Sequence, residues 1–181
     1  MERAKPFPTL LAILLTIAAA AARVPGPDRL RDILPAEGLI GPSVVEFRRQ
    51  PALDPHYYLA DETALGLDGR AEAVFARYSA DGGEALVLAV AYPDSEAAAR
   101  AQGRFGGDFF SRAFDPARDR FVEELESGDF AGIARAGPVL VVVLEAPSRA
   151  ACDGLLRRLE ERARSYRFLA PVPSSQGRSS S

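Results

Sequence analysis

The sequence predicts an α+β domain: an antiparallel sheet built from two β-hairpins plus an extra strand, with two longer helices packed on one face. Two observations predict it. Residues 73–113 read as an alternating strand, a glycine turn, a second strand and a capped helix. Residues 121–166 repeat that order in a looser form. Hairpin-then-helix order favours this arrangement over its rival, a ferredoxin-like βαββαβ fold beginning with a strand at Val44.

Residues 1–22 read as an export signal. Arg3 and Lys5 supply a positive start, and Leu10–Ala22 is apolar apart from Thr16. As a helix this run would be about 20 Å long, shorter than the ~30 Å hydrocarbon core of a bilayer. The alanines at its end suit cleavage just before Arg23. We therefore expect an extracytoplasmic protein, periplasmic or secreted. The alternatives are an uncleaved anchor in the inner membrane and a buried N-terminal helix.

The following segments predict one folded domain between two irregular regions. Residues 23–42 form a proline- and glycine-rich lead-in loop, in which Asp28–Leu34 has the pattern of a short helix. Residues 43–169 form the single α+β domain and begin with a strand at Val44–Phe47. Residues 170–181 are rich in proline and serine, which predicts a disordered tail.

The stretch Arg48–Leu67 is irregular, because Pro51 and Pro55 interrupt regular backbone. Its second part, Ala60–Leu67, has the composition for one or two helical turns. Because regular patterning fails here, this stretch is the place where we expect function to lie.

The first hairpin and helix follow. In the strand Ala73–Ser79, side chains alternate between two faces, with Val74, Ala76 and Tyr78 sharing one of them. Gly82 and Gly83 form the turn. The next strand, Glu84–Tyr92, is apolar on both faces, which is typical of a strand covered on both sides. Asp94 or Ser95 then caps a helix.

The second half repeats this order. Strands are predicted at Phe121–Leu125, Asp129–Ala134 and Pro138–Ala146, and Pro147-Ser148 starts the last helix. That helix carries one apolar stripe made of Cys152, Leu155, Leu156, Leu159, Ala163 and Tyr166.

These two halves resemble an exported bacterial family of unknown function, whose members carry two hairpin-plus-helix halves after a signal peptide. The resemblance lies in GRAEAVFARYSADGGEALVLAVAYPDSEAAARAQGRF (69–105) and GPVLVVVLEAPSRAACDGLLRRL (137–159). It implies export and this fold. The family has no established catalytic residues, so the resemblance implies none here.

Composition limits the chemistry. The chain has 181 residues, a net charge of −3, one histidine and one cysteine. A net negative charge does not attract nucleic acid, so we expect no such partner. A single cysteine permits neither an intramolecular disulfide nor a cysteine-based zinc site. We expect no metal and no cofactor.

His56 is the one candidate general base. Asp54 would orient it, and Tyr57 and Tyr58 would line its pocket. The alternative is a surface loop whose aromatic side chains fold over the edge of the core. No serine or cysteine has a nucleophile context such as G-x-S-x-G, so the catalytic interpretation rests on this segment alone.

Three further groups of residues have both a functional and a purely structural interpretation. Asp61-Glu62 and Glu123–Glu126 could serve glycoside hydrolysis or calcium binding, yet they match no EF-hand spacing and read more simply as solvated acids. Cys152 lies on an apolar stripe, where a thiol is usually inert. The last helix is basic, which suits anionic lipid or an acidic partner, or simply a solvated outer face. Its arginines are Arg149, Arg157, Arg158, Arg162, Arg164 and Arg167.

The sequence thus favours an exported, non-catalytic binding or structural domain of the bacterial cell envelope, with an unknown protein or envelope component as its partner. Such a domain should present an exposed patch on the sheet face opposite the helices. The alternatives are an extracytoplasmic hydrolase-like enzyme using His56 and a membrane-tethered structural subunit. Contact with the membrane is expected only if the N-terminal segment is not cleaved.

Overall fold

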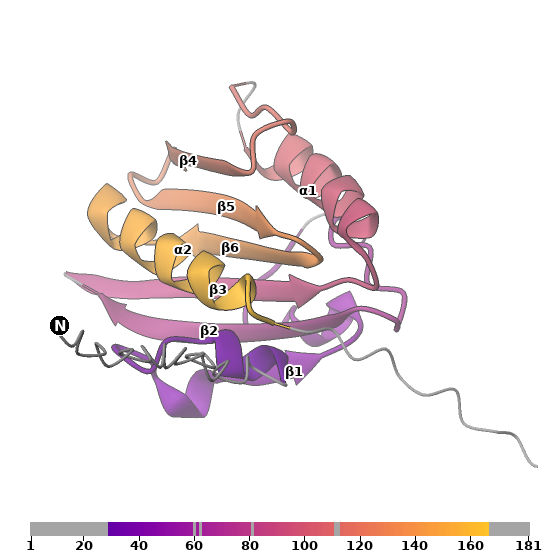
Figure 1. The fold of residues 1–181 in the computed structure, drawn as a ribbon. Helices are drawn as coiled ribbons and strands as arrows, with labels where there is room; N and C mark the ends of the chain where they lie inside the picture. Colours follow the sequence, from indigo (N-terminus) through magenta and orange to yellow (C-terminus); the bar gives the residue numbers. More distant parts are fainter. Residues whose placement is uncertain (1–28, 60, 62, 81, 111–112, 167–181) are drawn as a thin grey trace, which may run out of the picture.

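A computed structural model of the chain describes residues 29–59, 61, 63–80, 82–110 and 113–166. In this part, six strands form one antiparallel sheet in the order β1-β2-β3-β6-β5-β4 (Figure 1). The strands are β1 (Val45–Phe47), β2 (Glu72–Ala80), β3 (Gly83–Ala91), β4 (Arg120–Glu124), β5 (Phe130–Ala136) and β6 (Val139–Glu145). The α-helices are α1 (Ser95–Phe109) and α2 (Arg149–Ala163), and short 3-10 helices are η1 (Leu30–Ile33), η2 (Gly41–Ser43) and η3 (Gln50–Ala52).

The predicted α+β class is confirmed, with an antiparallel hairpin sheet and two longer helices. The ferredoxin-like rival does not apply, because three strands, not one, precede the first α-helix, and they lie side by side in the sheet. Each half is a three-stranded meander followed by a helix. The last strands of the two halves, β3 and β6, pair in the middle of the sheet, with Val87 opposite Val143 and Ala91 opposite Val139. The predicted export signal and tail lie outside the described residues.

The two helices divide between the faces of the sheet, which differs from the expected placement on one face. Helix α2 belongs to the same core cluster as Val74, Val87 and Val141, whereas α1 belongs to the cluster on the other face, with Phe75 and Leu88. The physical reason is that β3 and β6 are apolar on both faces, so each face needs a cover. The expected exposed patch opposite the helices is therefore not found in the described structure. Helix α1 and the loop between β1 and β2 cover the sheet face opposite α2.

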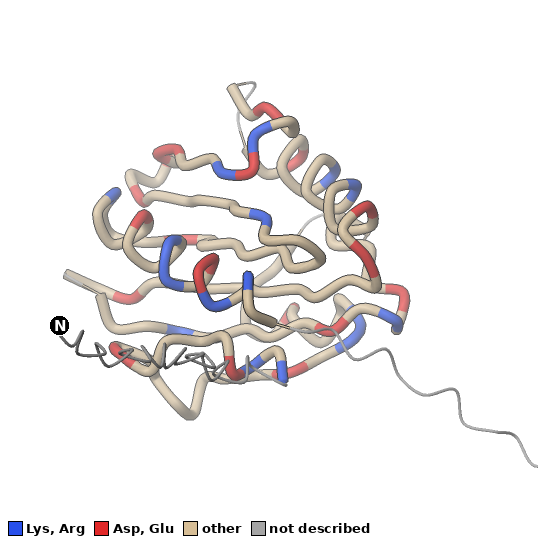
Figure 2. The backbone as a smooth tube through the Cα atoms, in the orientation of Figure 1, with Lys and Arg blue, Asp and Glu red and all other residues tan. Residues whose placement is uncertain are grey.

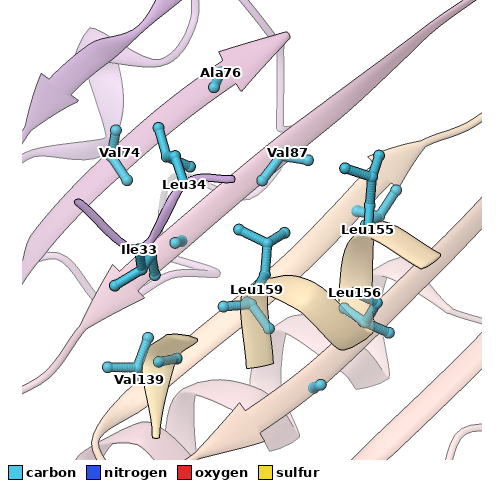
Figure 3. Close-up of a cluster of buried hydrophobic side chains, with 14 of the residues drawn as sticks. Ile33, Leu34, Val74, Ala76, Val87, Val139, Leu155, Leu156 and Leu159 are labelled. Atoms are coloured by element: carbon cyan, nitrogen blue, oxygen red, sulfur yellow. The ribbon is translucent and has the colours of Figure 1, made fainter. Parts of the chain in front are cut away.

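The α2-side core extends into the predicted lead-in. Leu30 and Ile33 of η1, and Leu34 just after it, are buried in the core cluster of α2. Figure 3 shows Ile33 and Leu34 beside Leu159 of α2 and Val74 and Val87 of the sheet. The Tyr78 hydroxyl donates to the Pro35 carbonyl at 3.0 Å, and the Ser79 N–H donates to the Gly38 carbonyl at 2.7 Å. Residues 29–42 therefore pack as part of the domain, because their apolar side chains recur at helical spacing.

Both helix starts follow the sequence prediction. The Asp94 Oδ1 accepts from the Ala97 N–H at 2.7 Å, and the Ser148 Oγ accepts from the Ala151 N–H at 3.1 Å. Each cap satisfies one backbone donor that a helix leaves unpaired at its start. Figure 2 shows the charged residues mainly on helices, turns and outer strands, with few in the central strands.

Candidate functional site

His56 does not form the predicted catalytic arrangement. Its ring stacks on the buried Phe75, with 5.7 Å between ring centroids. Among the described residues no hydrogen bond joins the imidazole to an acidic or hydroxyl group, and the neighbouring Asp54 is exposed. His56 also lines none of the hollows described below. Its packing matches the alternative interpretation, an aromatic side chain folded over the core.

Tyr57 and Tyr58, by contrast, line a hollow together. The hollow has a volume of about 260 Å³ and lies between the β1–β2 loop and the C-terminal half of α1. We name it the tyrosine groove and define it by Tyr57, Tyr58, Leu59, Asp61, Ala64, Phe105, Asp108 and Phe109. Tyr58 is 74% exposed, the one large hydrophobic side chain of the described residues that is largely exposed. The irregular stretch Arg48–Leu67 thus supplies one wall of the groove.

The floor of the groove is a rigid aromatic cluster. Phe105 and Phe109 of α1 stack with their centroids 5.0 Å apart, and Phe110 meets Phe109 edge-on at 5.1 Å. The cluster continues through Phe114 and Phe121. Such edge-to-face and offset contacts favour fixed ring positions. The groove therefore has a preformed apolar base.

A glycine in α1 makes room for this cluster. A side chain at Gly106 would overlap the Phe114 ring, which lies directly over its Cα. A glycine inside a helix costs about 1 kcal/mol relative to alanine. This local cost is offset by the close packing of Phe114 on the helix, which extends the floor beyond α1.

Three hydrogen bonds, made by the side chains of Gln50 and Tyr92, hold the wall of the groove. The Gln50 side chain is 3% exposed; its Nε2 donates to the Asp61 carbonyl at 2.6 Å, and its Oε1 accepts from the Leu65 N–H at 3.3 Å. From the end of β3, the Tyr92 hydroxyl donates to the Leu65 carbonyl at 2.7 Å. The loop is therefore held by hydrogen bonds at both Asp61 and Leu65.

The groove is acidic. The N–H and hydroxyl of Thr63 donate to the Asp61 Oδ1 at 2.7 and 2.8 Å, and they hold the pKa of Asp61 below its usual value. Asp108 is exposed on α1 at the other side of the hollow. No basic side chain is among the described lining residues. Asp61 therefore stays ionised at neutral pH.

Tyr57 is unsuited to acid–base work at neutral pH. Burial, together with a smaller contribution from the nearby Glu145 carboxylate, raises the pKa of Tyr57 to about 12. Glu145 reaches this face because the pairing of β3 with β6 shifts register, so that Leu86 faces Glu145 while Val87 faces Val143. The phenol remains protonated and offers a hydrogen-bond donor and an aromatic face.

We expect the protein to lose stability in alkali, because buried tyrosines favour the protonated phenol. Burial raises the pKa to about 12 for both Tyr57 and Tyr166, and raises it for Tyr78 and Tyr92 as well. Since the unfolded value is about 10, this stability is fully present below about pH 10 and is lost as pH rises towards the folded values. Urea midpoints measured from about pH 9 to about pH 11 should fall, and tyrosinate absorbance should rise with unfolding. A constant midpoint would contradict the burial of these phenols.

A larger hollow lies on the opposite face and is less suited to a ligand. It has a volume of about 480 Å³ between α2 and the turn at Glu37. Its lining includes the small residues Ala150 and Gly154, and it has the Arg158–Glu37 ion pair at 2.7 Å. None of its described lining residues is an exposed aromatic side chain, and Arg158 and Glu37 are already paired with each other, while Arg157 also lines it.

Cys152 and two arginines of the last helix have structural roles. Cys152 is fully buried beneath β5, and burial raises the pKa of its thiol to about 12, which makes it inert as predicted. Arg158 and Arg162 of the basic helix reach the lead-in, where Arg162 donates to the Asp32 carbonyl at 2.7 Å. The described residues contain no group of acids, histidine and cysteine that could hold a metal. None of the described helices has the length and hydrophobicity to cross a membrane.

Comparison of the chain with protein-family models, curated proteins and solved structures finds no match. The resemblance to an exported bacterial family therefore stays a prediction. The candidate site is therefore supported by the geometry of the structure alone.

Sequence reasoning located the loop side of the groove but missed the helix side and its supports. Asp108 and Phe109 follow a Gly106-Gly107 pair that made the helix end uncertain, and Gln50 sits beside a proline in an irregular stretch. The available signal was the group Phe105, Phe109 and Phe110, whose spacing places aromatic rings on one side of a helix.

Proposed function

We propose that this chain is an exported protein of the bacterial cell envelope whose folded domain acts by binding, with the tyrosine groove as its binding site. The observation that carries the proposal is Tyr58, 74% exposed at the edge of a preformed aromatic groove. Aromatic side chains are typical anchors of binding surfaces, because they provide large contact area with little loss of conformational freedom. An exposed tyrosine over an apolar floor fits that role.

Support for export comes from residues 1–22, with a positive start, an apolar run and a small-residue cleavage pattern. If the segment is cleaved, the mature chain begins at or near Arg23. N-terminal sequencing of the mature protein distinguishes this from the alternative of a subunit tethered to the inner membrane. An intact N-terminus in the membrane fraction would favour the tether.

The hydrolase alternative has little geometric support. A general base needs a position within hydrogen-bond reach of its proton donor, in a site that admits substrate. His56 stacks on Phe75 instead, and Tyr57 holds its proton at neutral pH. Binding requires neither group to transfer a proton.

The test is a differential capture from the envelope fraction. The bait proteins are the wild type, Tyr58→Ser in the groove, and Arg157→Ser in the hollow on the opposite face. We expect a component that is retained by the wild type and by Arg157→Ser, and is reduced at least five-fold by Tyr58→Ser. Equal retention by all three baits would move the binding site away from the groove. Loss with Arg157→Ser alone would place it on the α2 face.

A further inference from the structure

We propose that the tyrosine groove binds a peptide segment of its partner in which a basic side chain, arginine or lysine, lies next to an apolar one. This inference rests on the proposed binding function and names the class of ligand. It is carried by three properties of the groove: its charge, its exposed aromatic face and its size.

The charged side chains among the described lining residues of the groove are all acidic. Asp61 and Asp108 approach it from the loop and from α1, and no basic side chain is among its described lining residues. Arginine side chains gather in a separate hollow at the start of α1, where Arg70, Arg100 and Arg104 share the lining with Asp68 and Asp94. The arginines are thus grouped on one side of the β1–β2 loop, and the groove is left acidic. A ligand with a positive group complements it.

Both carboxylates can accept further hydrogen bonds from a ligand. Asp61 uses Oδ1 for Thr63, and no described residue donates a hydrogen bond to its Oδ2. Asp108 has no ion pair with any described residue. Among the described cations, Arg104 lowers the pKa of Asp61, and its electrostatic effect is the smallest of the contributions to that pKa. A guanidinium or ammonium group can therefore reach both sides of the groove without displacing an ion pair between described residues.

The exposed Tyr58 ring adds an independent attraction for a cation. A guanidinium within about 6 Å of an aromatic face is attracted by the ring quadrupole, and arginine also stacks on the ring. Beneath it, Phe105 and Phe109 offer an apolar floor for the aliphatic stem and for a neighbouring apolar residue. The same hollow thus accommodates both the charged end and the carbon chain.

The size of the groove indicates a side chain or two rather than a whole small molecule. Its volume of about 260 Å³ lies below the roughly 300–1,000 Å³ of pockets that enclose drug-sized ligands. A segment of a protein, laid across the open groove with one or two side chains inserted, fits this size. The occupant is therefore a peptide, and the remaining affinity would come from its contacts outside the groove.

The absence of tryptophan from the chain provides a clean assay. The probe is a short peptide with blocked ends, glycine-arginine-tryptophan-proline-glycine, and two matched versions carry glutamine or glutamate in place of arginine. Tryptophan fluorescence then reports the peptide alone when it is titrated with the full-length chain. We expect the arginine peptide to bind about ten-fold more tightly than the glutamine peptide, and the glutamate peptide more weakly than both. Added salt should reduce this difference.

Three variants separate the inference from the proposed function. The double variant Asp61→Asn with Asp108→Asn should bring the arginine peptide to the affinity of the glutamine peptide. Tyr58→Ser should weaken both peptides, and Arg157→Ser on the opposite face should change neither. If the arginine and glutamine peptides bind the wild type equally and Tyr58→Ser weakens both, the groove binds but the charge inference is wrong. If no peptide binds, the peptide inference is wrong, and the capture experiment with Tyr58→Ser still tests the groove. If the peptides bind and Tyr58→Ser has no effect on them or on capture, the groove is not the binding site and both proposals fail.

Discussion

Replacing Phe105 with alanine is expected to lower the free energy of unfolding by about 4 kcal/mol, the largest single effect predicted for this chain. Phe105 is 1% exposed and packs between α1 and the sheet. Its ring stacks on Phe109 and meets the Phe110 ring edge-on. Removing it deletes these contacts and leaves a cavity between the helix and the strands, because the fixed rings around it can close the space only partly.

Equilibrium unfolding in urea measures the loss, and Phe105→Leu provides a milder variant if the alanine protein does not fold. The leucine variant keeps most of the volume and should lose about 1.5 kcal/mol. Phe109→Ala is the matched control, since its ring is half-buried at the groove and should cost less than Phe105→Ala. Equal losses at Phe105 and Phe109 would contradict the packing of α1 on this face of the sheet.

Replacing Gln50 with leucine is expected to lower the free energy of unfolding by about 2 kcal/mol and to loosen the wall of the groove. The substitution leaves the Asp61 carbonyl and the Leu65 N–H without their side-chain partner. A buried polar group left unsatisfied costs about 1–3 kcal/mol. Amide hydrogen exchange at Leu65 should accelerate beyond what the global loss of stability explains, because the Leu65 N–H loses its acceptor.

Gln102→Leu is the control for this experiment. Gln50 and Gln102 are the two buried polar residues among those described. The Gln102 Nε2 donates to the Arg118 carbonyl at 2.8 Å, and its Oε1 accepts from the Arg135 Nε at 2.8 Å, away from the groove wall. It should therefore lose similar stability without the specific acceleration at Leu65. Identical exchange at Leu65 in the two variants would mean that Gln50 does not position the wall.

Much of the fold follows from local patterns. The six strands and both helix starts are predicted within a few residues, because alternation, glycine turns and polar caps act over short distances. The Ala60–Leu67 helical turns are an exception: the structure has a turn here, with Gly66 in the left-handed region at φ 58°. There, Gln50 and Tyr92 bind Asp61 and Leu65 from distant parts of the chain, and these contacts outweigh local helix propensity.

The candidate site was predictable only in part. Irregular patterning and three aromatic residues pointed to His56, Tyr57 and Tyr58, yet the histidine packs on Phe75 and the two tyrosines meet Phe105 and Asp108 instead. Two of the three groove residues on α1, Asp108 and Phe109, follow the Gly106-Gly107 pair. No sequence pattern indicated that Gln50 is buried, since a glutamine in a loop is usually exposed.

By itself, the sequence determined the α+β class, the antiparallel hairpins, the caps at Asp94 and Ser148, and the apolar stripe of α2. These depend on residue periodicity and on neighbours a few positions apart. Only the tertiary structure decided that the helices take opposite faces, that η1 completes the core, and that a loop and a helix about 50 residues apart form an acidic aromatic groove. Both faces of the sheet are apolar and need a cover. Which helix or loop covers which face depends on contacts between distant parts of the chain, and no local stretch of sequence encodes those contacts.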